Sequence, residues 1–134
     1  MAVERINPSE LYNSVNFGFS HATVSKEGGL LHLSGQVAWD KDNNLVGGDD
    51  LAAQARQALA NLKAVLADQG LDPSDLVRIR TYVVDHKPEK IGPVTGELMA
   101  FFGDVMPCAN TWLGVQTLVM PEFQIEIEAT AALR

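Results

Sequence analysis

The chain has 134 residues, of which 46% are hydrophobic, and this combination fits one compact domain with its own core and excludes a two-domain arrangement. Seventeen acidic residues against ten Lys and Arg give a formal net charge of −7, so the average field repels nucleic-acid phosphates and anionic lipid. The apolar runs are far shorter than the about 20 residues that a bilayer-spanning helix needs, and the N-terminus lacks the pattern of a signal peptide. The single cysteine, Cys108, excludes an internal disulfide and fits a reducing compartment, so we expect a cytoplasmic protein. From the charge and the short apolar runs, we expect neither a membrane nor a nucleic acid among its partners.

The N-terminal part of the chain predicts an irregular arm followed by a β-hairpin. Residues 1–16 carry no clear hydrophobic period, so we expect an irregular arm there. Residues 30–39 alternate between apolar and polar side chains, which is the pattern of a strand with one apolar face. Residues 17–25 are the expected antiparallel partner, joined to that strand through the turn at Gly28 and Gly29.

The next segment predicts a long amphipathic helix. Apolar side chains recur at helical spacing from Leu51 to Leu66, while polar side chains such as Gln54 fall on the other face. Asp50 lies where the free backbone N–H groups and the dipole of a helix N-terminus favour a carboxylate. Gly70 lies where a helix commonly ends.

The second half of the chain predicts a strand, a second helix and two closing strands. Residues 77–85 alternate and are rich in β-branched side chains, which favours a strand. Residues 93–102 repeat apolar side chains at helical spacing, and Pro93 suits the first turn of that helix. Residues 111–118 and 123–132 alternate again. The predicted order is therefore β-β-α-β-α-β-β, an α+β fold with two helices on one sheet face.

Strand parity assigns the side chains to two sheet faces. The core-facing set comprises Leu31, Leu33, Val37, Trp39, Val77, Ile79, Val83, Leu113, Val115, Ile125 and Ile127. The outward set comprises His32, Ser34, Gln36, Arg78, Arg80, Tyr82, Trp112, Gln116, Glu126 and Glu128. Two helices cover only one face, so the outward set meets water or another copy of the chain. Its Tyr, Trp and Arg side chains favour a homo-oligomer. A solvated face with Arg–Glu pairs across strands, worth roughly 0.2–1 kcal/mol each, fits parity equally well.

No sequence motif by itself carries a reaction. His21, His32 and His86 occur at no metal-ligand spacing and near no acidic cluster, so we expect no metal ion and no cofactor. A thiol nucleophile at Cys108 would need a base that the sequence does not identify, and an apolar packing role is the better interpretation. The paired glycines lack the strand–GxGxxG–helix context of a nucleotide-binding fingerprint and are interpreted as turns.

Four groups of residues, taken together, resemble a known family. They are Leu33-Ser34-Gly35-Gln36-Val37, Gln54 with Asn61-Leu62, Pro107-Cys108-Ala109-Asn110-Thr111 and Ile125-Glu126-Ile127-Glu128-Ala129. In this order and spacing they resemble the RidA family, also called YjgF or L-PSP, over residues 16–131. The resemblance implies a single chorismate-mutase-like α+β domain spanning residues 1–134. It also implies that three subunits pack their sheets into a central barrel and form ligand clefts at the subunit boundaries.

The resemblance further implies a chemistry, from which this sequence departs. Deaminases of the family hydrolyse enamine and imine intermediates such as 2-aminoacrylate and 2-iminopropionate, releasing ammonia and a 2-keto acid. Their arginine in a Pro-Ala-Arg-Ser/Thr-like segment holds the substrate carboxylate while a water attacks the imine carbon, and its match here is the neutral Asn110. Phe19 matches a family tyrosine without its hydroxyl, and Thr95 matches the asparagine of the second helix. Gly35 and the strand glutamate, Glu126, are retained.

These matches lead to two hypotheses. The expected ligand-binding residues are Phe19, Gly35, Thr95, Asn110 and Trp112, and the candidate catalytic residue is Glu126. The first hypothesis is a RidA-like homotrimer that binds a small metabolite, for which a carboxylate-bearing compound is one candidate, with weak or absent 2-iminopropionate deaminase activity. The second is an enamine or imine deaminase for another amine-bearing substrate, such as a 2-aminomuconate-like acid.

Two further points stay open at this level. L-PSP-type endoribonuclease activity ranks last, because the sequence offers no basic groove and no catalytic His pair. Arg78 or Arg80 is an alternative source of the positive charge that Asn110 lacks.

Overall fold

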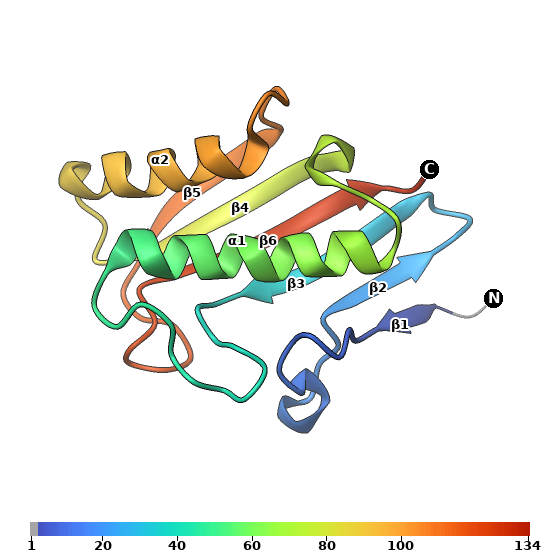
Figure 1. Ribbon diagram of the computed structural model, residues 1–134, viewed down its shortest axis with the longest axis horizontal. Coiled ribbons are helices and arrows are strands. Elements are labelled where there is room, and N and C mark those ends of the chain that lie inside the picture. The colour runs from blue at the N-terminus through green and yellow to red at the C-terminus, as the bar shows by residue number, and fades with distance from the viewer. Residues whose placement is uncertain (1–2) are drawn as a thin grey trace.

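A six-stranded sheet with two helices across one face forms the fold in the computed structural model, which describes residues 3–134 (Figure 1). The strands are β1 (Glu4–Ile6), β2 (Ala22–Ser25), β3 (Leu30–Gln36), β4 (Leu76–Val84), β5 (Ala109–Val115) and β6 (Ile125–Ala132). The helices are α1 (Leu51–Asp68) and α2 (Ile91–Phe102), with short 3₁₀ helices η1 (Ser14–Phe17), η2 (Pro73–Asp75) and η3 (Pro88–Lys90). The sheet order is β1-β2-β3-β6-β4-β5, and all neighbours are antiparallel except β4 and β5. The predicted α+β architecture with both helices on one face is confirmed.

Helix α1 builds the core and also holds the loop before β6. Its apolar stripe is buried as the periodicity predicted, and Asp50 caps it by accepting a hydrogen bond from the backbone N–H of Ala53 at 3.2 Å. Gln54 was predicted on the outer side of the helix, but it is fully buried. Its amide donates to the carbonyl of Glu122 at 3.0 Å and accepts from the backbone N–H of Gln124 at 2.9 Å. These bonds satisfy a buried polar side chain and fix the loop to the helix.

Asn61 lies about two turns after Gln54 on the same face of α1, and it holds the segment that follows β3 in the same way. Its side-chain N–H group donates to the carbonyls of Val37 and Trp39, at 3.1 and 3.0 Å. The two amide side chains therefore hold two loops that lie far apart in the sequence. Both loops contribute to the cleft described below.

The parity prediction is confirmed at most positions, for example at Ile79, Val83 and Ile125, but two irregularities in strand pairing contradict it locally. The register between β3 and β6 shifts between Leu33 and Gln36, so Gln36 is fully buried rather than outward. The register between β4 and β6 shifts between Leu76 and Arg78. As a result Leu76 is buried and Val77, predicted in the core, is 48% exposed. A register shift breaks the alternation where it occurs, so the residues on its two sides follow different parities, and alternation in the sequence does not reveal it.

The edge strand β5 also presents the face opposite to the predicted one. Trp112 pairs in register with Thr81, which is fully buried, and the indole packs partly buried against the core. Leu113, predicted inward, is 43% exposed. Because β5 is held by β4 alone, its facing follows the register of that one parallel pairing.

The N-terminal region is more ordered than its sequence predicts. The expected irregular arm contains β1, which pairs antiparallel with β2 at the sheet edge. The expected strand over residues 17–25 is shortened to β2, because η1 precedes it. Gly18 ends η1 in the left-handed conformation with φ 89°, which a glycine adopts at little cost.

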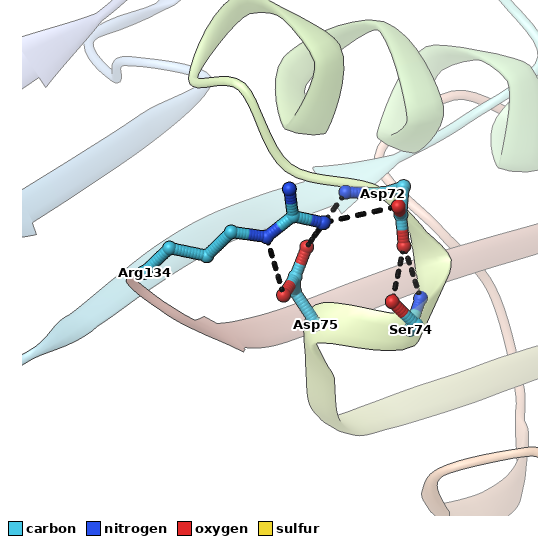
Figure 2. Close-up of polar contacts among 4 residues, drawn as sticks. All are labelled: Asp72, Ser74, Asp75 and Arg134. Carbon is cyan, nitrogen blue, oxygen red and sulfur yellow. Dashed lines mark hydrogen bonds and ion pairs between the residues drawn. The ribbon is translucent and has the colours of Figure 1, made fainter.

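The C-terminus is fastened to the connection between α1 and β4 (Figure 2). The guanidinium of Arg134 donates to Asp75 at 2.9 and 3.2 Å and to Asp72 at 3.0 Å. Asp72 in turn accepts from the backbone N–H of Ser74 and caps η2. Hydrogen bonds from Ser74, and then the Arg134 charge, lower the pKa of the Asp72 carboxyl. This cluster lies at the opposite end of β6 from Glu126 and takes no part in the cleft.

Candidate functional site

A cleft of about 520 Å³ opens where the segment before β2, the end of β3 and the loop before β6 meet. Its lining residues are Tyr12, Phe17, Phe19, Ser34, Gly35, Val37, Trp39, Val119, Met120, Phe123 and Glu126. We call it the aromatic cleft, because five of these eleven residues are Phe, Tyr or Trp. Of the lining residues, only Glu126 carries a formal charge at neutral pH.

Trp39 is the centre of the ring cluster. The rings of Tyr12 and Phe123 meet it edge to face, with centroids 5.3 and 5.0 Å away, and Phe17 is tilted against it at 5.6 Å. These distances lie within the range of favourable aromatic pairs. Tyr12 is buried, whereas Phe17 and Phe19 at the mouth are 58% and 38% exposed. Two exposed phenylalanines beside a cleft are typical of a surface that meets a ligand or another subunit.

Glu126 lines the cleft and lies against Gly35. A Cβ built on Gly35 would overlap the Glu126 carboxylate, so only glycine at this position lets the carboxylate rest on the β3 backbone. Burial raises the pKa of Glu126, and the neighbouring charge of Glu128 raises it further. Within residues 3–134 the Glu126 carboxylate makes no hydrogen bond and no ion pair. The carboxylate is therefore half-buried, uncompensated and open to the cleft.

A buried polar pair supports the wall behind Tyr12. His21 Nε2 donates to the carbonyl of Tyr12 at 2.8 Å, and the Gln36 side-chain amide donates to His21 Nδ1 at 2.9 Å. With one ring nitrogen donating and the other accepting, the imidazole is neutral. Burial lowers the pKa of His21, which agrees with that state. His21 is therefore a structural residue, and it positions the segment that carries Tyr12.

The residues expected from the sequence fall into two groups within one chain. Phe19, Gly35 and Glu126 lie together in the aromatic cleft. The other three, Thr95, Asn110 and Trp112, lie on α2 and β5 and do not line it.

The second group has its own surroundings. The Asn110 side-chain oxygen accepts a hydrogen bond from the hydroxyl of Thr81 at 3.2 Å, and the residue is exposed. Trp112 lies beside His86 with ring centroids 5.8 Å apart. Its indole N–H is buried without a hydrogen-bond partner in the described part of the chain.

The arginines considered as substitutes for the missing charge lie on the outer sheet face. Arg78 donates to the hydroxyl of Thr111 at 3.0 Å, and Arg80 lies 3.7 Å from the Glu128 carboxylate. Both line a separate hollow with His32. Neither contacts the aromatic cleft of the same chain.

Other sites considered from the sequence can be placed as well. Cys108 is half-buried, and burial raises the pKa of its thiol, so the nucleophilic thiolate is disfavoured. Across residues 3–134, no group of three or more His, Cys, Asp or Glu is arranged to hold a metal ion. No helix in the same range is long and apolar enough to cross a membrane.

Comparison with known proteins identifies the family. The profile of the family described as endoribonuclease L-PSP matches residues 13–133. The chain belongs to this family, also called RidA or YjgF. The chain is 32% identical over 108 residues to the 2-iminobutanoate/2-iminopropanoate deaminase of Salmonella typhimurium, covering 80% of this chain and 82% of that protein.

Solved structures of RidA-family proteins share the fold. A protein of the Rid family from Yersinia pestis, YyfB, described as of unknown function, is 51% identical with a TM-score of 0.77, over 99% of this chain and all of that one. The YjgF product of E. coli is 27% identical with a TM-score of 0.84, over 98% of this chain and 99% of that one.

In this RidA-family chain, sequence reasoning missed most of the cleft wall. Tyr12 lies in the segment expected to be irregular, and no period pointed to it. Phe17 and Phe123 lie in loops, where side-chain direction does not follow a simple alternation. Trp39 was predicted to face inward, and it does so at the cleft rather than in the main core.

Proposed function

We propose that this RidA-family chain forms a homotrimer whose inter-subunit clefts bind a small metabolite, and that its 2-iminopropionate deaminase activity is weak or absent. The charge of the aromatic cleft carries the proposal. A cleft whose one charged side chain is Glu126 repels a substrate carboxylate instead of holding it. An arginine fork would supply charge-assisted, bidentate bonds that the neutral amide of Asn110 does not replace.

The division of the expected residues supports a cleft completed by a neighbouring subunit. Asn110, Thr95 and Trp112 lie away from the three residues that share the cleft of the same chain. In the proposed trimer, one subunit contributes the aromatic cleft and its neighbour contributes Asn110. Because each chain would carry only half of the site, Phe17 and Phe19 are left exposed in a single chain.

The outer sheet face supports assembly through its chemistry. Tyr82 donates a hydrogen bond to Glu128, and Arg80 pairs with the same carboxylate, so three polar side chains form one connected group on β4 and β6. Tyr and Arg are enriched at protein interfaces, and no helix covers this face (Figure 1). We propose that the face is buried at the centre of the trimer.

A second candidate is an enamine or imine deaminase for another amine-bearing substrate, such as a 2-aminomuconate-like acid. The raised pKa of Glu126 favours it, because a carboxyl that titrates closer to neutrality exchanges protons more readily with a bound water. The relative from S. typhimurium carries the name of an imine deaminase. Endoribonuclease activity, named in the family description, fits worse with a net charge of −7.

Two measurements test the proposal. Multi-angle light scattering at micromolar concentration should give three times the chain mass, and a monodisperse monomer would contradict both the trimer and the shared cleft. A coupled assay that generates 2-aminoacrylate in situ should show turnover near background. We also propose that the protein is cytoplasmic, since a single cysteine fits a reducing compartment, and cell fractionation would test this location.

A further inference from the structure

We infer that the aromatic cleft selects an organic cation, a protonated amine or iminium with an apolar body, an assignment that rests on the cleft being the ligand site proposed above. The inference concerns the charge of the ligand rather than its identity. It follows from three features of the cleft: its rings, its single carboxylate and its lack of basic side chains.

The rings supply one half of the recognition. Phe17 and Phe19 are the exposed rings of the cleft, and Trp39 lies beside Phe17 with centroids 5.6 Å apart. The buried rings of Tyr12 and Phe123 pack edge to face against Trp39, at 5.3 and 5.0 Å, and support it from behind. Aromatic faces attract cations through the ring quadrupole, and cages of several rings are the usual way in which proteins bind alkylated ammonium groups. The same rings also take up the apolar part of the ligand.

Glu126 supplies the other half. Its carboxylate opens into the cleft without a hydrogen bond or ion pair in the described part of the chain. The neighbouring charge, Glu128, has the same sign and is already engaged with Tyr82 and Arg80. A cation in the cleft would offset the cost of leaving the Glu126 charge half-buried, because an opposite charge favours the ionised form.

Anionic ligands lack a comparable partner. The lining that one chain contributes contains no Lys, Arg or His, and Asn110, which we propose comes from the neighbouring subunit, is neutral. The net charge of −7 adds a field that repels anions and attracts cations. Arg78 and Arg80 are occupied on the outer sheet face, in a different hollow. A volume of about 520 Å³ accommodates a small aromatic or branched amine.

The test compares three probes that share one phenyl ring and differ in charge: 2-phenylethylamine, 2-phenylethanol and phenylacetate. Isothermal titration calorimetry on the full-length protein at low ionic strength should rank them amine, alcohol, acid. We expect the amine to bind at least ten-fold more tightly than the alcohol, which corresponds to about 1.4 kcal/mol. Glu126→Gln should reduce the preference for the amine over the alcohol to the smaller part that the rings supply, and it should change the affinity for the alcohol much less.

Two further variants test whether the preference for the amine depends on the Glu126 carboxylate and the rings of the cleft, rather than on the net charge of the protein. Glu122→Gln removes the same charge from an exposed side chain of the adjacent loop, and it should leave the affinity for the amine within about two-fold. Phe17→Leu keeps the apolar bulk at the mouth but removes the ring quadrupole. It should therefore lower the affinity for the amine more than the affinity for the alcohol. Thermal unfolding of each variant checks that the protein remains folded.

The outcomes distinguish this inference from the proposed function. Equal binding of all three probes, or tighter binding of phenylacetate, overturns the cation assignment while leaving the cleft as a ligand site. An amine preference that is undiminished in Glu126→Gln also overturns it. Binding of none of the probes to folded trimer overturns both, and indicates that side chains of another copy fill the cleft.

Discussion

The carboxylate of Glu126 rests against the Cα of Gly35, in the part of β3 where its register against β6 shifts. Gly35 is not required here for a left-handed backbone, since its φ is not positive. It is required for space, because any side chain at this position overlaps the carboxylate. The position of the one charged group in the cleft therefore depends on the absence of a Cβ on the neighbouring strand.

Gly35→Ala tests this relationship. The added methyl group displaces Glu126 or bends β3, so we expect the free energy of unfolding to fall by roughly 1–3 kcal/mol, as in other overpacked sites. Affinity for a cleft ligand should fall at least ten-fold. Chemical denaturation and calorimetric titration measure the two effects. Gly96→Ala is the matched control, because a Cβ there meets open space on α2, and it should be neutral or stabilising by up to about 1 kcal/mol.

A double variant isolates the cause. If the clash with the carboxylate is responsible, Gly35→Ala should cost little stability in a Glu126→Ala background, where that carboxylate is gone. An equal cost in both backgrounds would attribute the effect to the strand rather than to Glu126.

Asn110→Arg should recover part of the activity that the family deaminases have. Each charge-assisted hydrogen bond contributes roughly 1.5–3 kcal/mol, or about one to two powers of ten in rate. We expect wild-type turnover of 2-iminopropionate near background and a partial gain in the variant, since Phe19 and Thr95 also depart from the family pattern. Asn110→Lys should gain less, because an ammonium lacks the planar fork of arginine.

Wild-type turnover equal to that of an arginine-bearing relative would refute this prediction. In that case Arg78→Ala and Arg80→Ala become the decisive variants. Abolished turnover in one of them would show that the outer-face arginine replaces the missing charge across a subunit boundary.

Cys108→Ser should leave ligand affinity within a few fold. Burial raises the pKa of the thiol, and its sulfur donates to the carbonyl of Ala109 at 3.3 Å. The same titrations used for the cleft measure the effect. Loss of binding in a correctly folded Cys108→Ser protein would overturn the assignment of Cys108 to packing.

His21 should make stability sensitive to pH. Burial lowers its pKa, so below about pH 6.5 the unfolded chain binds a proton that the folded protein excludes, and the folded state loses stability as the pH falls. His21→Gln should be less stable than the wild type at pH 7.5, because the bonds to Tyr12 and Gln36 are disturbed. The gap between the two unfolding free energies should narrow between pH 7.5 and 5.5. A constant gap would contradict a buried neutral imidazole.

Local patterns in the sequence were sufficient for the order of the two helices and of the five longer strands, although they missed the edge strand β1. The alternation over residues 30–39 and 77–85 and the stripe from Leu51 to Leu66 depend on side chains that are neighbours in the chain, so the elements were predicted near their observed positions. The resemblance to the RidA family, carried by short strings of residues, is confirmed by the family match over residues 13–133.

Tertiary structure decided which side chains face the cleft. Gln36, Val77 and Trp112 contradict parity because strand register depends on pairing between segments far apart in the chain, and one shift reverses the facing. The aromatic cleft likewise joins three separate segments, and the ring of Tyr12 enters it from a region without any period. Hydrophobic periodicity reflects the arrangement of residues within one helix or strand. The cleft is formed by contacts between elements, and those contacts form only when the sheet packs against α1.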